Sequence, residues 1–287
     1  MRNKDTLLEI SFKEEVKYDG FESLSLSDLI AIPKDHDPYQ PHRISFYTLI
    51  LITEGRVDHM LDYEHYPLEK NDCLIISKNQ VHAFDPNANY VGYAFLFTDH
   101  YLENNLSRPA YFKVLGLFNY HLSQSKHRAN STTLDSLHHL IVECEKSDYE
   151  YKSSIIASLF TVVLLKLCSQ SSNQNRFETK SGFDLFQAFK MLVENGYNKS
   201  RNVNYHVEKL GISHKYLNEI CKRFTGKTAK EFLDHYVVLE IKRKLSATSN
   251  VNGICYECGF SEPSNFHKYF KKQTGQSIME FRKSMFG

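Results

Sequence analysis

Two copies of one sequence pattern near the C-terminus constrain this chain more than any other feature. One copy extends from Gly211 to Phe232 and the other from Gly259 to Phe281. Each has a glycine, an apolar residue, a serine able to cap a helix, a lysine-rich amphipathic stretch, then Thr-Gly and a later Glu-Phe. A short helix, a glycine turn and a second capped helix form a helix-turn-helix, whose second helix enters the DNA major groove. The repeat therefore predicts two DNA-binding units in tandem.

Charge is distributed unevenly along the 287 residues. Residues 183–287 contain 17 Lys and Arg against 10 Asp and Glu, a net charge of +7, whereas the remainder contains 18 against 24, a net of −6. A basic part joined to an acidic part is expected when only one half of a protein contacts a polyanion. The charge supports the motif, although lysines that only solvate a surface would give the same balance.

Residues 46–97 have the pattern of short strands separated by turns. Strands at even spacing, with turn residues such as Glu54 and Gly55 between them, favour a small antiparallel barrel or jelly roll. Three- and four-residue apolar spacing then predicts two helices, Leu134–Cys144 and Tyr151–Cys168. The predicted strands are Tyr47–Thr53, Arg56–Asp62, Cys73–Ser77 and Tyr90–Phe97.

The helix predicted over Tyr151–Cys168 carries more apolar residues than one buried face needs. Packing across the barrel and pairing with a second copy of the chain both account for the excess. Polar residues 169–182 form the predicted linker between two domains. For pairing, the predicted dimerisation residues are Leu159, Val163, Leu164 and Leu167.

The chain is expected to be a reduced, cytoplasmic protein, associated with the nucleoid when bound to DNA. No apolar segment follows the N-terminus, so no secretory signal is expected, and the apolar run Ile155–Cys168 is expected to be too short to span a membrane. Cys255 and Cys258 have the spacing of a zinc or redox motif, but helical periodicity directs both sulfurs to the core. No metal or cofactor is expected.

In the first unit, Val203–Leu210 is the predicted supporting helix and Ser213 the N-cap of the recognition helix. Outward-facing Asn, Lys and Glu side chains can pair with adenine, guanine and cytosine respectively. The predicted buried stripe is Leu217, Ile220, Cys221 and Phe224. The predicted DNA contacts are His214, Lys215, Asn218, Glu219 and Lys222, of which Lys222, together with Arg223, contacts phosphates.

In the second unit, Ser261 is the predicted N-cap, and proline is tolerated near the helix start because its missing N–H would be unpaired there. A connecting helix, Phe232–Leu245, holds the recognition helices about one DNA turn apart. Its predicted buried residues are Leu233, Val237, Val238, Ile241 and Leu245, and those of the second unit are Ile254, Cys255, Cys258, Phe266, Tyr269 and Phe270. The predicted base contacts are Pro263, Ser264, Asn265, His267 and Lys268, and the predicted phosphate contacts are Lys242, Lys244 and Lys271.

With these features, Phe183–Phe286 resembles the DNA-binding domain of AraC/XylS-type transcriptional regulators, most strongly over Ile254–Ser277. The strands from Phe46 to Gly55 and the turn from Ile76 to Phe84 resemble the cupin-like sensory domain of such regulators. The resemblance implies a sensory and dimerisation domain at 1–168, with a barrel at about 20–100 and helices at about 110–168. It also implies a DNA-binding domain at 183–287, with helix-turn-helix units at about 203–225 and 252–274.

Departures from the family pattern fall mainly in the core. Cys255 and Val207 stand where alanine is usual, Val237 where arginine is frequent, and Cys221 where phenylalanine is usual. Glu219 is an acid where a basic or amide residue is common, and it is expected to narrow the DNA sequence that the helix binds.

The resemblance implies a transcriptional regulator that binds promoter DNA as a homodimer, with RNA polymerase and a small-molecule effector as further candidate partners. One alternative is an effector-independent regulator controlled by a partner protein. Another is a cupin metalloenzyme fused to a DNA-binding domain, but the sequence lacks a His-x-His pair and no converging ligands are expected. The candidate ligands for that alternative are His42, His59, His65 and His82. The effector, the operator and the direction of regulation stay open.

Overall fold

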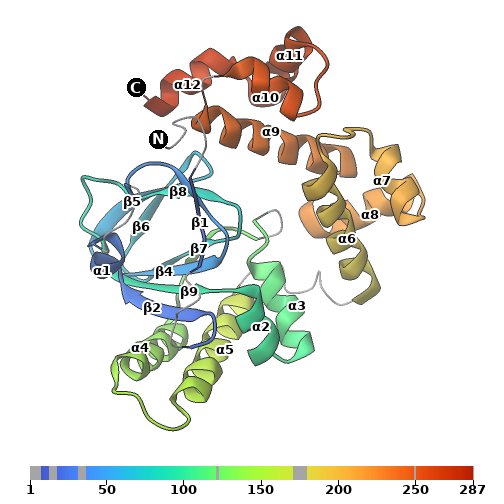
Figure 1. Cartoon of the computed structure of the whole chain (residues 1–287). Coiled ribbons are helices and arrows are strands. Elements are labelled where there is room, and N and C mark those ends of the chain that lie inside the picture. Colours follow the sequence, from blue (N-terminus) through green and yellow to red (C-terminus); the bar gives the residue numbers. More distant parts are fainter. Residues whose placement is uncertain are drawn as a thin grey trace. The chain divides into compact units, whose positions relative to one another are not determined.

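The computed structural model describes residues 8–12, 18–31, 37–120, 123–170, 180–248 and 250–286. The chain divides into two compact units, and each is described by itself: Leu8–Gln174 is called the first unit here, and the unit that contains Asn175–Gly287 is called the second. The first unit combines strands with helices, and the second is helical over its described residues (Figure 1). Positions 171–179 of the predicted linker lie outside the described residues.

Two five-stranded sheets form the barrel of the first unit, in the orders β1-β3-β8-β5-β6 and β10-β7-β4-β9-β2. One parallel pair, β1 with β3, departs from the otherwise antiparallel pattern. The predicted jelly-roll-like barrel is therefore confirmed. The strands are β1 (Leu8–Ile10), β2 (Phe21–Ser25), β3 (His42–Ile44), β4 (Tyr47–Glu54), β5 (Arg56–Leu61), β6 (Glu64–Glu69), β7 (Asp72–Ile76), β8 (Val81–Ala83), β9 (Val91–Phe97) and β10 (Lys126–Arg128).

Strand β4 is buried on both faces, which explains its continuous apolar sequence. Side chains alternate between the two faces of a strand. Ile50 and Ile52 belong to the core between the two sheets. Leu49 and Leu51 belong instead to a second core, formed between the sheet and the helices.

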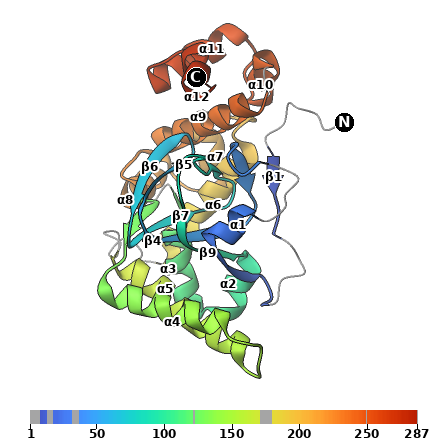
Figure 2. The same ribbon diagram turned by 90° about the vertical axis from the view of Figure 1, so that its left-hand side faces the viewer.

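Helices cover the outer face of the sheet that contains β4, and α4 lies alongside α5 (Figure 2). Val163, Leu164 and Leu167 are at most 1 % exposed, because they fill the second core of their own domain. Leu159 is partly buried against the same core. The burial contradicts the prediction that these residues face a second copy. The helices are α1 (Leu26–Ala31), α2 (Asp99–Asn105), α3 (Arg108–Leu117), α4 (Ser131–Glu145) and α5 (Lys152–Gln170).

The exposed apolar side chains of α5 lie on a different stripe from the predicted one. Ile155, Val162 and Leu165 are 39 %, 43 % and 36 % exposed, and Val142 of the adjacent α4 is 41 % exposed. By length and composition alone, with a mean hydropathy of 1.6, α5 could cross a membrane. The helix meets this length because it extends beyond the apolar run Ile155–Cys168 at both ends. The packing of α5 against the sheet is that of a core helix.

In the second unit, α9 lies between two helix groups (Figure 1). Phe186 and Phe189 of α6 pack against Phe232 of α9, with ring centroids 5.4 and 5.5 Å apart. The predicted apolar stripe of α9 is buried throughout. The helices are α6 (Lys180–Gly196), α7 (Val203–Leu210), α8 (His214–Thr225), α9 (Ala229–Ala247), α10 (Val251–Glu257), α11 (Pro263–Thr274) and α12 (Ile278–Phe286).

Candidate nucleic-acid interface

The first helix-turn-helix consists of α7, a tight turn and α8. Gly211 ends α7 in the left-handed region with φ of 65°, a conformation that glycine adopts without steric cost. The Ser213 hydroxyl accepts a hydrogen bond from the Tyr216 backbone N–H at 3.2 Å, so the predicted N-cap of α8 is present. The predicted apolar stripe is at most 4 % exposed.

The opposite face of α8 is polar and faces solvent. His214, Lys215, Glu219 and Lys222 are exposed, and Asn218 is partly buried. Lys215 Nζ lies 4.0 Å from a Glu219 carboxylate oxygen, so the two charges partly offset each other. Base contact by any of these residues stays a prediction. Tyr216 and Arg223 are also exposed and lie next to the buried stripe. Tyr216 was not among the residues predicted to face outward, because an aromatic ring is usually buried.

Asn218 is engaged within the protein. Its Oδ1 accepts a hydrogen bond from the Ala229 backbone N–H at 2.9 Å, and its Nδ2 lies 3.0 Å from His214 Nδ1. Since Ala229 is the first residue of α9, the side chain satisfies a helix N-terminal donor that the helix itself cannot. Asn218 therefore joins the first recognition helix to the connecting helix.

The second helix-turn-helix consists of α10, a turn at Cys258 and Gly259, and α11. The N-cap of α11 is Glu262, without a side-chain capping bond, so the prediction of Ser261 as the cap was wrong. Pro263 follows as the first helical residue and needs no N–H partner. Cys255 and Cys258 are fully buried, as the periodicity predicts, and burial raises the pKa of the Cys258 thiol to about 12.

The outer face of α11 matches that of α8 in chemistry. Phe266 and Phe270 are fully buried and anchor the helix. Pro263 is half-buried. The exposed side chains are the predicted Ser264, Asn265, His267, Lys268 and Lys271, together with Lys272.

Asp234 of α9 holds the second recognition helix. Its carboxylate accepts hydrogen bonds from the Tyr269 hydroxyl at 3.0 Å and from the Gln273 side-chain amide at 3.3 Å, both on α11. It also pairs with Lys230 Nζ at 2.6 Å. Burial, with the neighbouring Asp234 charge, raises the pKa of Tyr269, so its hydroxyl stays a donor. Ala229 and Asp234, little more than one turn apart on α9, thus attach both recognition helices to it.

Two predicted phosphate contacts of α9 already have intramolecular partners. Lys244 Nζ lies 2.6 Å from a Glu257 carboxylate oxygen. Lys242 Nζ lies 5.6 Å from the centre of the Phe281 ring, in the range of a cation–π contact. Both lysines are partly buried, and their contact with DNA stays a prediction.

In the barrel, three of the four candidate metal-ligand histidines converge, contrary to expectation. His42 on β3 is the register partner of His82 on β8, and the ring centroids are 4.3 Å apart. His59 Nε2 of β5 lies 3.2 Å from His82 Nδ1. His65 lies apart and pairs with Asp58 at 2.8 Å. Within the described ranges, no cluster of three or more His, Cys, Asp or Glu side chains has an arrangement suited to a metal ion.

The histidine cluster is fully desolvated at its centre. His59 is 0 % exposed, and burial, with a contribution from the charge of His42, lowers its pKa to about 3. The Tyr90 hydroxyl lies 3.4 Å from His59 Nδ1 and donates to the Asp58 carbonyl at 3.0 Å. The sheet thus places a neutral imidazole and a hydroxyl among apolar side chains.

Two domain models of known protein families match the two parts of this architecture. An AraC-like ligand binding domain matches residues 28–160, and a helix-turn-helix domain matches residues 207–284. The HTH-type transcriptional activator RhaS of Yersinia pestis (strain Pestoides F) is 24 % identical over 283 residues, covering 93 % of this chain and 97 % of RhaS. RhaS of Yersinia pseudotuberculosis serotype O:3 (strain YPIII) is equally similar. The structure of ToxT from Vibrio cholerae aligns with a TM-score of 0.45 at 13 % identity, covering 93 % of this chain and 100 % of ToxT.

The two domain matches lie in the same order as the two structural units. The chain belongs to the AraC family of transcriptional regulators, as the sequence pattern predicts. It is a DNA-binding regulator with a separate ligand-binding-type domain.

Proposed function

We propose that the chain binds two short promoter elements, about one DNA turn apart, through the outer faces of α8 and α11. The observation that carries the proposal is the attachment of both recognition helices to the first turns of α9, through Asn218 and Asp234. Attachment to one helix, α9, keeps the distance between α8 and α11 fixed. At a fixed distance, two short DNA elements are bound together as one longer, more specific site.

Charge supports the same assignment. The net charge of +7 over residues 183–287 attracts the phosphate backbone. The polar side chains on the outer faces supply donors and acceptors for base edges. Lys222, Arg223 and Lys271, exposed at the later turns of the two helices, are proposed phosphate contacts.

For the N-terminal barrel domain, we propose that a small molecule binds inside the barrel and controls the activity of the regulator. The match to an AraC-like ligand binding domain supports this, together with the polar groups of His42, His59, His82 and Tyr90 among the buried apolar side chains of the barrel. A few convergent polar groups in an apolar setting are typical of small-molecule sites. No catalytic role is proposed, and the proposed location is the cytoplasm.

We further propose that the protein is a homodimer. The surface that supports pairing is the stripe formed by Ile155, Val162 and Leu165 on α5 with Val142 on α4. Pairing would double the DNA contacts and raise the affinity for paired sites through effective concentration.

Selection of bound duplexes from a random library, with the full-length chain, tests the DNA-binding proposal. Two conserved elements with centres about 10 base pairs apart are expected. The double variant Lys215→Ala/Lys268→Ala is the matched control and should enrich both elements less, because it removes one exposed cation from each face. If the duplexes bound by the wild-type chain showed no enriched sequence element, the proposal would be contradicted.

A further inference from the structure

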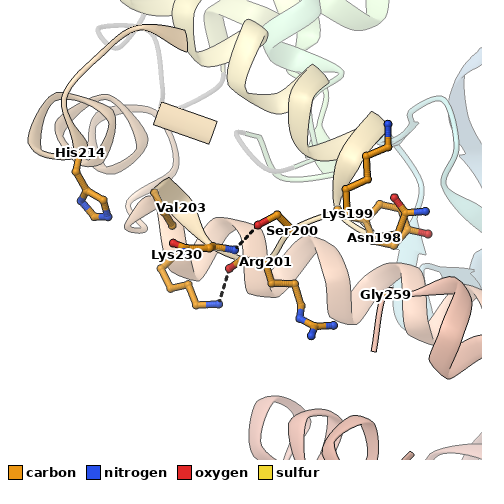
Figure 3. Close-up of a pocket in the computed structure, with 10 residues that line it drawn as sticks. Asn198, Lys199, Ser200, Arg201, Val203, His214, Lys230 and Gly259 are labelled. Carbon is orange, nitrogen blue, oxygen red and sulfur yellow. Dashed lines mark hydrogen bonds between the residues drawn. The ribbon is translucent and has the colours of Figure 1, made fainter. Parts of the chain in front are cut away.

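A cavity of about 600 Å³ opens on the second unit, and residues of both helix-turn-helix units line it (Figure 3). His214, at its edge, is the first residue of α8, and Gly259 belongs to the turn that precedes α11. The loop before α7 supplies most of the other lining residues. The lining residues are Tyr197, Asn198, Lys199, Ser200, Arg201, Asn202, Val203, His214, Lys230 and Gly259.

The loop before α7 packs directly against the second helix-turn-helix. Gly259 has φ of 74°, and a Cβ at this position would lie 1.9 Å from the Asn198 carbonyl oxygen. Only glycine therefore allows this approach. The Arg201 guanidinium lies 3.5 Å from the centre of the Phe260 ring and donates to the Cys258 carbonyl at 3.3 Å. These contacts hold the loop, and with it most of the cavity lining, against the turn that precedes α11.

The lining favours an anion. It contains two lysines and one arginine but no Asp or Glu. Figure 3 shows the Arg201 and Lys230 side chains extending to the same side of the loop, whereas that of Lys199 points away from them. Planar guanidinium groups and lysine ammonium groups are the usual protein partners of phosphate oxygens.

Lys230 has a donor to spare for a ligand. Its Nζ donates to Asp234 Oδ1 at 2.6 Å and to the Arg201 carbonyl at 3.2 Å. An ammonium group has three N–H donors, so these two bonds leave one. Asp234 and the Arg201 carbonyl also fix the position of Nζ at the cavity, so little conformational entropy is lost when an anion binds.

From this geometry we propose that the cavity binds a backbone phosphate of the DNA between the two elements contacted by α8 and α11, with Lys230 and Arg201 as its ligands. The inference rests on the proposed function. When two helices occupy successive major grooves, the backbone that separates these grooves runs between them. The cavity lies between the starts of the two recognition helices, where that backbone passes.

Neutral methylphosphonate substitutions test this proposal. They are placed one at a time at each phosphate between the two elements of a duplex selected by the wild-type chain. At one or two positions, wild-type affinity should fall roughly tenfold, as expected for lost hydrogen bonds to a charged group. Lys230→Gln should bind the unmodified duplex correspondingly more weakly and lose its sensitivity at the same positions.

Two further variants separate this effect from a general loss of charge or of folding. Lys230→Arg keeps a cation and should retain the sensitivity, and Lys209→Ala removes an exposed lysine of α7 outside the cavity and should retain it too. Lys230→Gln should also lower the slope of log affinity against log salt by about 1. An unchanged methylphosphonate profile in folded Lys230→Gln would overturn the proposal, even where duplex selection succeeds. Binding of adenosine monophosphate to the wild type but not to Lys230→Gln, without DNA, would overturn it in favour of a free phosphate ester.

Discussion

Asn218 Oδ1 accepts a hydrogen bond from the Ala229 backbone N–H at 2.9 Å, so a residue on the polar outer face of α8 also caps the connecting helix. Asn218→Ala should therefore lower the unfolding free energy by about 1 kcal/mol, the usual cost of a lost cap, as well as weaken DNA binding. Asn218→Asp keeps the acceptor and should restore most of the stability. Thermal melting of the three proteins checks this, and equal melting temperatures would leave Asn218 as a DNA contact alone.

The two recognition helices should act on separate elements. Lys215→Ala on α8 and Lys268→Ala on α11 should each cost roughly 1–3 kcal/mol of binding free energy and relax base preference in one element only. Lys222→Ala should weaken binding to all sequences alike. Duplex selection with each variant is the measurement. The same loss on selected and random duplexes for Lys215→Ala or Lys268→Ala would assign these residues to phosphates.

Asp234 should control the spacing between the elements. Asp234→Asn weakens the bonds to Tyr269 and Gln273, so α11 is held less firmly. On duplexes whose two elements are moved apart by one to three base pairs, the preference of the wild type for one spacing should fall roughly tenfold in the variant. Glu208→Gln, on the exposed side of α7, is the control. An unchanged spacing preference in Asp234→Asn would show that packing alone sets the distance.

A glutamate introduced into α5 should affect stability at a buried position and dimerisation at an exposed one. Leu164 is 1 % exposed, so Leu164→Glu buries a carboxylate in the domain core and should cost several kcal/mol of stability. Val162 is 43 % exposed, so Val162→Glu should keep the melting temperature and yield a monomer. Light scattering at micromolar concentration measures both. A wild-type monomer, or an unchanged dimer in Val162→Glu, would reject this surface.

The barrel should lose stability in mild acid because of His59. Its folded-state pKa of about 3 lies below the value of 6.5 for an exposed imidazole, so the unfolded chain takes up the proton first. The contribution is complete above pH 6.5 and is lost as the pH falls towards 3, with about 1 kcal/mol gone by pH 5.5. Unfolding of wild type and His59→Gln across this range gives the comparison. The variant should show the smaller slope, and His138→Gln, at an exposed site, should match the wild type.

Local periodicity was sufficient to predict several elements. The stripe of Leu217, Ile220 and Phe224 could be found from the sequence because its residues recur at helical spacing on one face of α8. Strand β6 was missed because Pro67 weakens the strand pattern, and proline is tolerated there since β6 lies at the edge of its sheet.

Contacts between distant segments could not be predicted in the same way. His42, His59 and His82 meet only because β3, β5 and β8 are neighbours in one sheet, an order that does not follow the sequence. On α5 the number of apolar residues was informative, but their division between core and surface depends on the positions of the sheet and α4. The roles of Asn218 and Asp234 likewise depend on where α9 begins relative to α8 and α11.

The two-faced burial of β4 has a mechanical consequence. Leu49 and Ile50 are adjacent in sequence yet belong to different cores, so the strand is a partition one backbone thick. Closely packed interiors have little free volume to absorb a shift. A displacement of Ile50 or Ile52 from inside the barrel is therefore expected to move Leu49 and Leu51, and with them the packing of α5. A structural change inside the barrel is thus expected to be transmitted to α5 through one strand and the single layer of side chains on its outer face.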